Sequence, residues 1–213
     1  MDYLEIIIKG FVIGLLASMP LGPIGVMCIQ RTINNKFLSG FVSGCGAASA
    51  DFFFATIALF FFSFIEPYLA NNLEVIKLIG GLVIAIVGLS ILLKKSVANL
   101  RQNRNSKRNL LKDFFSIFGL TVTNPAYILV FLGLFSYFKV EDIDFTIFTH
   151  IIMLIGVLSG AVLWWFSLTT LVNSFRKKFT LKHIFYINRI AGVAISGIGV
   201  IAMISSIIEF IEK

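Results

Sequence analysis

The sequence predicts an all-α integral membrane protein with six transmembrane helices arranged as a 3+3 inverted repeat. Three observations lead to this prediction: the composition, the placement of basic residues between apolar runs, and a likeness between the two halves of the chain. Of 213 residues, 58 % are hydrophobic and 14 % are charged, with a mean hydropathy of +0.94. Soluble domains contain about 25 % charged residues. Apolar runs longer than about 18 residues recur along the chain, which is typical of membrane-spanning helices.

Six apolar segments account for most of the chain. We expect spans at about 5–29, 38–64, 75–93, 113–138, 146–173 and 185–208. Residues 1–93 would form the first three-helix repeat and residues 113–213 the second. The segment 94–112 between them is basic and polar, which indicates a solvated cytoplasmic loop that also touches anionic headgroups.

Lysine and arginine divide unevenly between the two sides that these spans define. Four of the 18 lie on one side and the other 14 lie on the opposite side; the four are Lys9, Lys77, Lys139 and Lys213. The positive-inside rule therefore places the loops after spans 1, 3 and 5 in the cytoplasm and both termini on the outer side. These loops account for the net charge of +7, so no nucleic-acid partner is expected. The first basic cluster follows the first apolar run, which predicts a retained span and not a signal peptide.

The two halves resemble each other most clearly in spans 3 and 6. At a constant offset of 111 residues, Gly81 and Gly88 match Gly192 and Gly199. Small residues of this kind are expected to let helices pack closely, and Gly40 and Gly44 in span 2 belong to the same class. Three spans is an odd number, so the second copy must enter the membrane inverted. Inverted repeats with broken helices are a transporter design whose binding site lies near the midplane.

Two helix breaks are expected at corresponding places in spans 1 and 4. Pro20 and Pro23 each remove a helix donor, and Gly22 between them lets the backbone leave helical geometry. In span 4 the matching break is Asn124-Pro125. Backbone groups freed in this way must face protein or water, so these five residues are candidates for substrate binding or gating. The alternative is a pair of simple kinks.

Asp51 is the one carboxylate expected near the middle of a span. A charged Asp there costs roughly 2.5–3.5 kcal/mol, so it is rarely present without a role. Gly40, Gly44, Ala48 and Asp51 recur on one helical stripe, which predicts that Asp51 faces the interior of the bundle. We interpret it as a proton-coupling or cation-binding carboxylate. The alternative is a structural Asp that caps the break or pairs with a buried partner. Its counterpart in span 5 is Leu163, so the halves differ chemically.

No cofactor, metal site or catalytic constellation is predicted. Cys28 and Cys45 both lie in the first half, whereas a transmembrane thiol–disulfide electron carrier needs cysteines from both halves. A metal-ion exporter of related architecture is the other alternative. His150, His183 and one buried acid are a poor ligand set for a transition metal.

The ordered motifs of the chain resemble the LysE/RhtB family of amino-acid exporters. They are PLGP at 20–23, GFVSGCGAASAD at 40–51, NP at 124–125 and NRIAG at 188–192. Leu21 stands where many members have the first proline of a P-G-P signature, so the family's backbone path at the break does not carry over to this chain. The resemblance implies a transporter of the bacterial inner membrane and no enzyme. Its partners would be the lipid bilayer and a small-molecule substrate, an amino acid or related metabolite exported in exchange for protons. It leaves the individual substrate and a homo-oligomer open.

Overall fold

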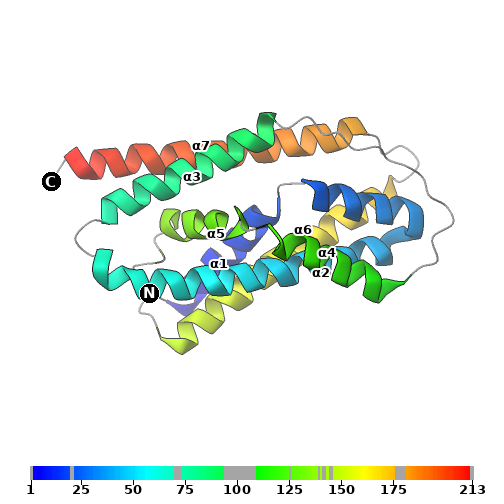
Figure 1. Cartoon of the computed structure of the whole chain (residues 1–213), viewed down its shortest axis with the longest axis horizontal. Coiled ribbons are helices and arrows are strands. Elements are labelled where there is room, and N and C mark those ends of the chain that lie inside the picture. Colours follow the sequence, from blue (N-terminus) through cyan, green and yellow to red (C-terminus); the bar gives the residue numbers. More distant parts are fainter. Residues whose placement is uncertain are drawn as a thin grey trace.

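A computed structural model describes residues 2–19, 22–69, 73–93, 109–124, 126–138, 140, 143, 146–175 and 181–211. Within these residues the chain is all-α and has no strand (Figure 1). The seven helices are α1 (Tyr3–Ser18), α2 (Pro23–Leu69), α3 (Leu73–Leu93), α4 (Leu110–Val122), α5 (Ala126–Tyr137), α6 (Ile147–Ser174) and α7 (Leu181–Ile211).

The long helix α2 is in fact a helical hairpin. Its backbone leaves helical geometry at Lys36, which has φ 70° and ψ −178°. The two legs, 23–35 and 37–69, fold back on each other, and a Cβ added at Gly40 would meet the side chain of Thr32. The predicted first span therefore consists of α1 and the first leg of α2. Where a basic turn was expected between spans 1 and 2, the helical backbone is interrupted at Lys36 alone, and the chain changes direction there.

The predicted fourth span is likewise divided, into α4 and α5. The two helices are bent by 73° across the break. Helix α4 begins at Leu110 because the side chain of Asn109 accepts a 3.0 Å hydrogen bond from the Lys112 amide and so caps the helix. Helix α4 therefore starts three residues before the predicted start of span 4 at about residue 113, and residues 94–108 of the predicted loop lie outside the described residues.

Helices α3 and α7 pack against each other along their lengths and run antiparallel (Figure 1). A Cβ added at Gly81 would meet the carbonyl oxygen of Gly199 at 3.0 Å. A Cβ added at Gly192 would meet the carbonyl oxygen of Gly88 at 3.1 Å. Because 81 and 192 differ by 111, as 88 and 199 do, one contact becomes the other when this offset is applied.

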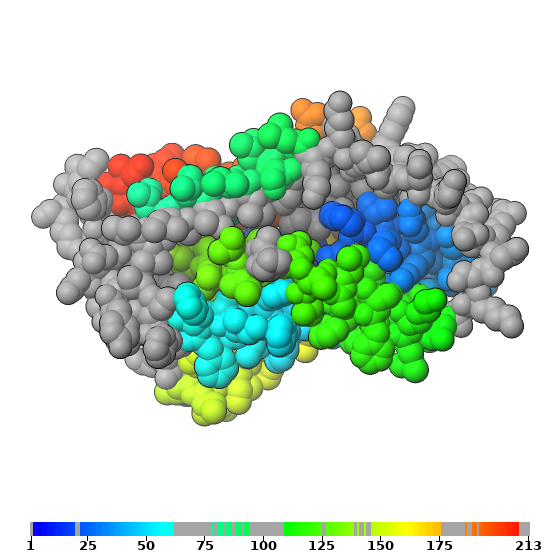
Figure 2. Space-filling view, viewed as in Figure 1, coloured from blue at the N-terminus to red at the C-terminus, as the bar shows by residue number. Residues whose placement is uncertain are grey.

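Two further helix pairs approach closely through glycine, α6 with α1 and α2 with α4. A Cβ added at Gly156 of α6 would meet the amide nitrogen of Phe11 at 2.9 Å. A Cβ added at Gly46 of α2 would meet the amide nitrogen of Phe118 at 3.3 Å. Figure 2 shows α4 seated directly against α2 on the visible face. Small residues thus bring backbones together in both halves of the chain.

The apolar interior has two parts. The first joins α1, α5 and α6 to the second leg of α2 and includes Ile13, Phe54 and Phe131. The second surrounds the first leg of α2 and includes Cys28 and Trp165.

By length and composition, two helices of the described chain could cross a membrane. They are Pro23–Phe61, which includes the reversal at Lys36, and Ile147–Ser174; the bent pair α4 and α5 adds a third if it is counted as one span. The chain is therefore an all-α protein with two or three apolar span candidates among the described residues. The six spans stay a prediction.

Candidate functional site

The first helix break lies between Ser18 and Pro23. Helix α1 ends at Ser18, and the Met19 amide donates to the Leu16 carbonyl at 3.3 Å. Helix α2 begins at Pro23, one residue after Gly22. Gly22 is half-buried and a Cβ there would meet nothing within 4 Å. Pro20 and Leu21 lie outside the described residues.

The second break lies between Val122 and Ala126. The Asn124 amide donates to the carbonyl of Thr121 at 3.0 Å, and the Asn124 carbonyl accepts from the Tyr127 amide at 3.3 Å. The backbone of Asn124 therefore closes α4 and opens α5. Asn124 is exposed, as is Pro23 at the first break. Pro125 lies outside the described residues.

Asp51 lies in the interior beside the first break. It is only 2 % exposed, and its Oδ2 accepts a 2.6 Å hydrogen bond from the hydroxyl of Ser18, the last residue of α1. Within the described part of the chain, no lysine or arginine forms an ion pair with it. A buried charge without a counter-charge is costly. Among the described residues, the hydrogen-bond partner of this buried carboxyl group is the Ser18 hydroxyl.

One turn along the helix, Phe54 links Asp51 to the second break. The ring of Phe54 stacks on the ring of Tyr127, with centroids 5.9 Å apart and planes at 11°. Tyr127 lies in the first turn of α5 and within electrostatic reach of Asp51. The structure thus brings together the acid, the end of α1 and the start of α5. Ser18 and Tyr127 were not singled out from the sequence, because neither residue type stands out in an apolar span.

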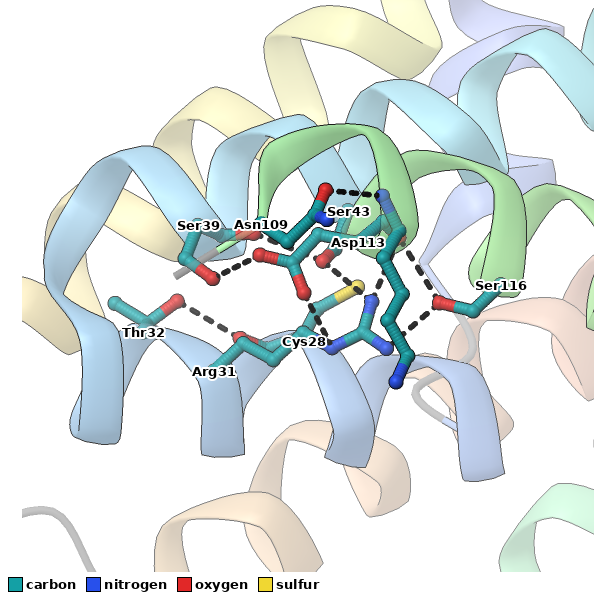
Figure 3. Close-up of polar contacts among 9 residues, drawn as sticks. Cys28, Arg31, Thr32, Ser39, Ser43, Asn109, Asp113 and Ser116 are labelled. Atoms are coloured by element: carbon teal, nitrogen blue, oxygen red, sulfur yellow. Dashed lines mark hydrogen bonds and ion pairs between the residues drawn. The ribbon is translucent and has the colours of Figure 1, made fainter. Parts of the chain in front are cut away.

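A second polar cluster was also missed, and it lies at the reversal end of the α2 hairpin. Figure 3 shows Arg31 reaching from the first leg of α2 to Asp113 in α4, with serines from the second leg of α2 and from α4 around them. The distribution of acidic residues in the sequence could have pointed to Asp113. Of the eleven acidic residues, nine lie on the predicted outer side, and the two others are Asp51 and Asp113.

Two tryptophans of α6 follow Leu163, the counterpart of Asp51 in the predicted span 5. Trp165 is 2 % exposed and its ring packs on Gly44, while Leu163 is exposed. The indole N–H groups of Trp164 and Trp165 are buried and have no hydrogen-bond partner among the described residues. In the same part of the chain, no group of His, Cys, Asp and Glu could hold a metal ion.

Comparison with known proteins assigns the chain to a family. A family model described as LysE type translocator matches residues 15–206. The chain belongs to this family. The match covers both helix breaks, Asp51 and the Arg31–Asp113 pair. Translocators are transport proteins of membranes, so the family places the chain among multi-pass membrane transporters of small molecules and not among enzymes.

One curated relative of this LysE type translocator comes from Bacillus subtilis (strain 168). It is named "Putative amino acid efflux protein YcgF" and is 27 % identical over 197 residues, which cover 90 % of this chain and 92 % of the relative. No solved structure matches the chain significantly.

Proposed function

We propose that this LysE type translocator is a secondary transporter that exports amino acids or related small metabolites across the bacterial inner membrane in exchange for protons. Family membership over residues 15–206 supports transport. The name of the Bacillus relative supports amino acids as the substrate class. The buried acid beside a helix break supports a coupled carrier over a passive pore, because it offers a group that can be charged on one side and neutral on the other.

The substrate would bind where the two breaks approach each other. The residues assigned to it are Pro20, Gly22, Pro23, Asn124 and Pro125. Helix ends present unpaired amide and carbonyl groups, which suit the carboxylate and ammonium groups of an amino acid. The ends of α1 and α4 at Ser18 and Val122 support this placement.

Asp51 would couple the movement of substrate to that of protons. The observation that carries this assignment is the 2.6 Å hydrogen bond from Ser18 at the end of α1 to the buried carboxyl group of Asp51. Protonation of Asp51 changes the charge directly at the break, so proton binding and the shape of the substrate site are linked.

The six spans would form an inverted repeat with both termini on the outer side. Two contact patterns support this arrangement. The Gly81–Gly199 contact becomes the Gly192–Gly88 contact at an offset of 111 residues, in a pair of antiparallel helices. A two-fold axis that exchanges α3 and α7 must run perpendicular to these two antiparallel helices. If the helices cross the membrane, this axis lies in the membrane plane. The α1–α6 and α4–α2 pairs then correspond to each other. The glycines of these contacts serve close packing.

A metabolite-export profile tests the proposal. Bacterial cells with and without the gene are fed dipeptides, which they hydrolyse to amino acids inside. Cells that carry the gene should release one or a few amino acids faster and retain less of them. A profile in which no amino acid or related metabolite differs between the two strains would contradict export.

A further inference from the structure

Arg31, on the first leg of α2, is held by groups from the second leg of α2 and from α4. Its Nε lies 3.4 Å from Oδ1 of Asp113 in α4. One terminal nitrogen donates to the hydroxyl of Ser43 at 2.8 Å and to the Asp113 carbonyl at 2.7 Å, and the other donates to the hydroxyl of Ser116 at 2.7 Å. On the opposite side, the hydroxyl of Ser39 donates to Oδ2 of Asp113. We call these five residues the Arg31–Asp113 cluster (Figure 3).

The cluster fastens the first half of the chain to the second. Arg31, Ser39 and Ser43 come from the two legs of α2, whereas Asp113 and Ser116 come from the first turns of α4. The side chains of Arg31 and Asp113 are 18 % and 12 % exposed. In the described part of the chain the other ion pair, Lys9–Glu5, lies within α1. Arg31–Asp113 is thus the described ion pair that joins two helices.

The cluster lies at one mouth of the proposed transport path. Ser39 precedes Asp51 by 12 residues on the same helical leg, a rise of about 18 Å at 1.5 Å per residue. That is more than half of the roughly 30 Å hydrocarbon thickness, so an acid near the midplane puts the cluster at a membrane face. Lys36, where the hairpin reverses, and the basic segment before α4 make this the cytoplasmic face under the positive-inside rule.

Behind the cluster the path is filled with apolar side chains. Cys28, Ala47 and Ile117 are at most 2 % exposed and belong to one packed group. Cys28 lies one turn from Arg31 and accepts a hydrogen bond from Thr32 through its carbonyl at 2.8 Å. The polar cluster and this apolar layer together close the route between the cytoplasm and Asp51.

We propose that the Arg31–Asp113 cluster is the cytoplasmic gate of the transporter. In this conformation the gate is shut. Opening it requires Arg31 to leave Asp113 and its two serine acceptors, which separates the first leg of α2 from α4. Water solvates both charged groups once they part, which offsets part of the cost of separating them. This inference rests on the proposed function, because a gate implies a transport path.

Cys28 provides a native reporter for the gate. The chain has two cysteines, so Cys45→Ser leaves Cys28 as the single thiol. Inside-out membrane vesicles are treated with a membrane-impermeant maleimide, and the rate at which Cys28 is labelled is measured. In the parent the rate should be slow, because Cys28 is fully buried behind the cluster.

Asp113→Asn and the paired change Arg31→Gln with Asp113→Asn open the gate by removing the ion pair. Each should raise the labelling rate roughly tenfold or more over the parent, since contacts to charged groups are the stronger hydrogen bonds. The paired change leaves neither charged group buried without its partner. Arg31→Lys keeps the positive charge but loses the guanidinium group, whose two terminal nitrogens bind Ser43 and Ser116. Arg31→Lys should give an intermediate rate. The matched control is Glu5→Gln, which removes the ion pair within α1 and should leave the rate unchanged.

If the folded variants are labelled at the parental rate, the proposal of a gate is wrong. The same holds if only Arg31→Lys folds and it is labelled at the parental rate. The readout needs no substrate, so the two proposals fail separately. Faster labelling without any exported amino acid would contradict the proposed function alone. Active export with unchanged labelling would contradict the gate alone.

Discussion

The hydroxyl of Ser18 donates a 2.6 Å hydrogen bond to Oδ2 of Asp51, and so joins the end of α1 to the interior of the second leg of α2. Both residues are buried, at 3 % and 2 % exposure. A change in the charge of Asp51 therefore acts directly on the residue where the first helix breaks. The proposed coupling of protons to substrate depends on this one contact.

Asp51→Asn should abolish export driven by a pH gradient and leave folding intact. The amide keeps an oxygen that can accept from Ser18 but no longer takes up or releases a proton. The measurement is transport of the exported amino acid in inside-out vesicles with and without a pH gradient. Glu5→Gln, which neutralises a half-exposed acid of α1, serves as the control and should transport normally. Full gradient-driven transport by Asp51→Asn would rule out the coupling role.

Ser18→Ala should lower the free energy of unfolding by about 1–3 kcal/mol, because it leaves a buried acceptor without its donor. Thermal unfolding in detergent measures the effect in the parent and in an Asp51→Ala background, which lacks the acceptor. The two changes share one contact, so their effects should not add. Strict additivity in this double-mutant cycle would show that the hydrogen bond does not contribute to stability.

Gly88→Ala and Gly199→Ala should destabilise the α3–α7 pair by similar amounts, about 1–3 kcal/mol each. A Cβ at Gly88 would lie 2.8 Å from the Cα of Ser196, and a Cβ at Gly199 would lie 2.7 Å from the Cα of Ala85. Gly197 of the same helix faces open space and is the matched control. There alanine should be neutral or stabilise by up to about 1 kcal/mol through its helix propensity. Equal effects at 197 and 199 would argue against close packing of α3 on α7.

Lys36→Gly should raise the free energy of unfolding by about 1 kcal/mol, because the φ of 70° and ψ of −178° at Lys36 lie in a region that strains any residue with a Cβ. Lys36→Ala is the control for the lost charge, since alanine keeps the strain. Lys36→Val should be the least stable of the three. Thermal unfolding of the set gives the order, and a glycine variant no more stable than the alanine variant would contradict the strained reversal.

Local chemistry made several features predictable. Proline lacks an amide donor and crowds the turn before it, so the ends of α1 and α4 could be placed within a few residues from the sequence. The stripe of Gly40, Gly44, Ala48 and Asp51 follows from helical spacing, and all four residues are buried. The bounds of α6 lie one residue from the predicted span.

The start of α4 and the division of the first span were predicted less well. With Asn109 as its cap, α4 begins at Leu110, three residues before the expected start. A single capping residue is hard to recognise in a segment that is basic and polar throughout. Likewise, Arg31 was counted only as a loop charge, whereas the first leg of α2 continues helically past it.

The sequence alone determined the membrane class, the family resemblance, the helix breaks and the burial of Asp51. Each follows from composition or from neighbours a few residues apart. Only the tertiary structure decided what these features touch. Arg31 and Asp113 are 82 residues apart, and Ser18 is 33 residues from Asp51. Such contacts depend on how the helices pack against one another through their glycines, and this packing cannot be predicted from a local sequence pattern.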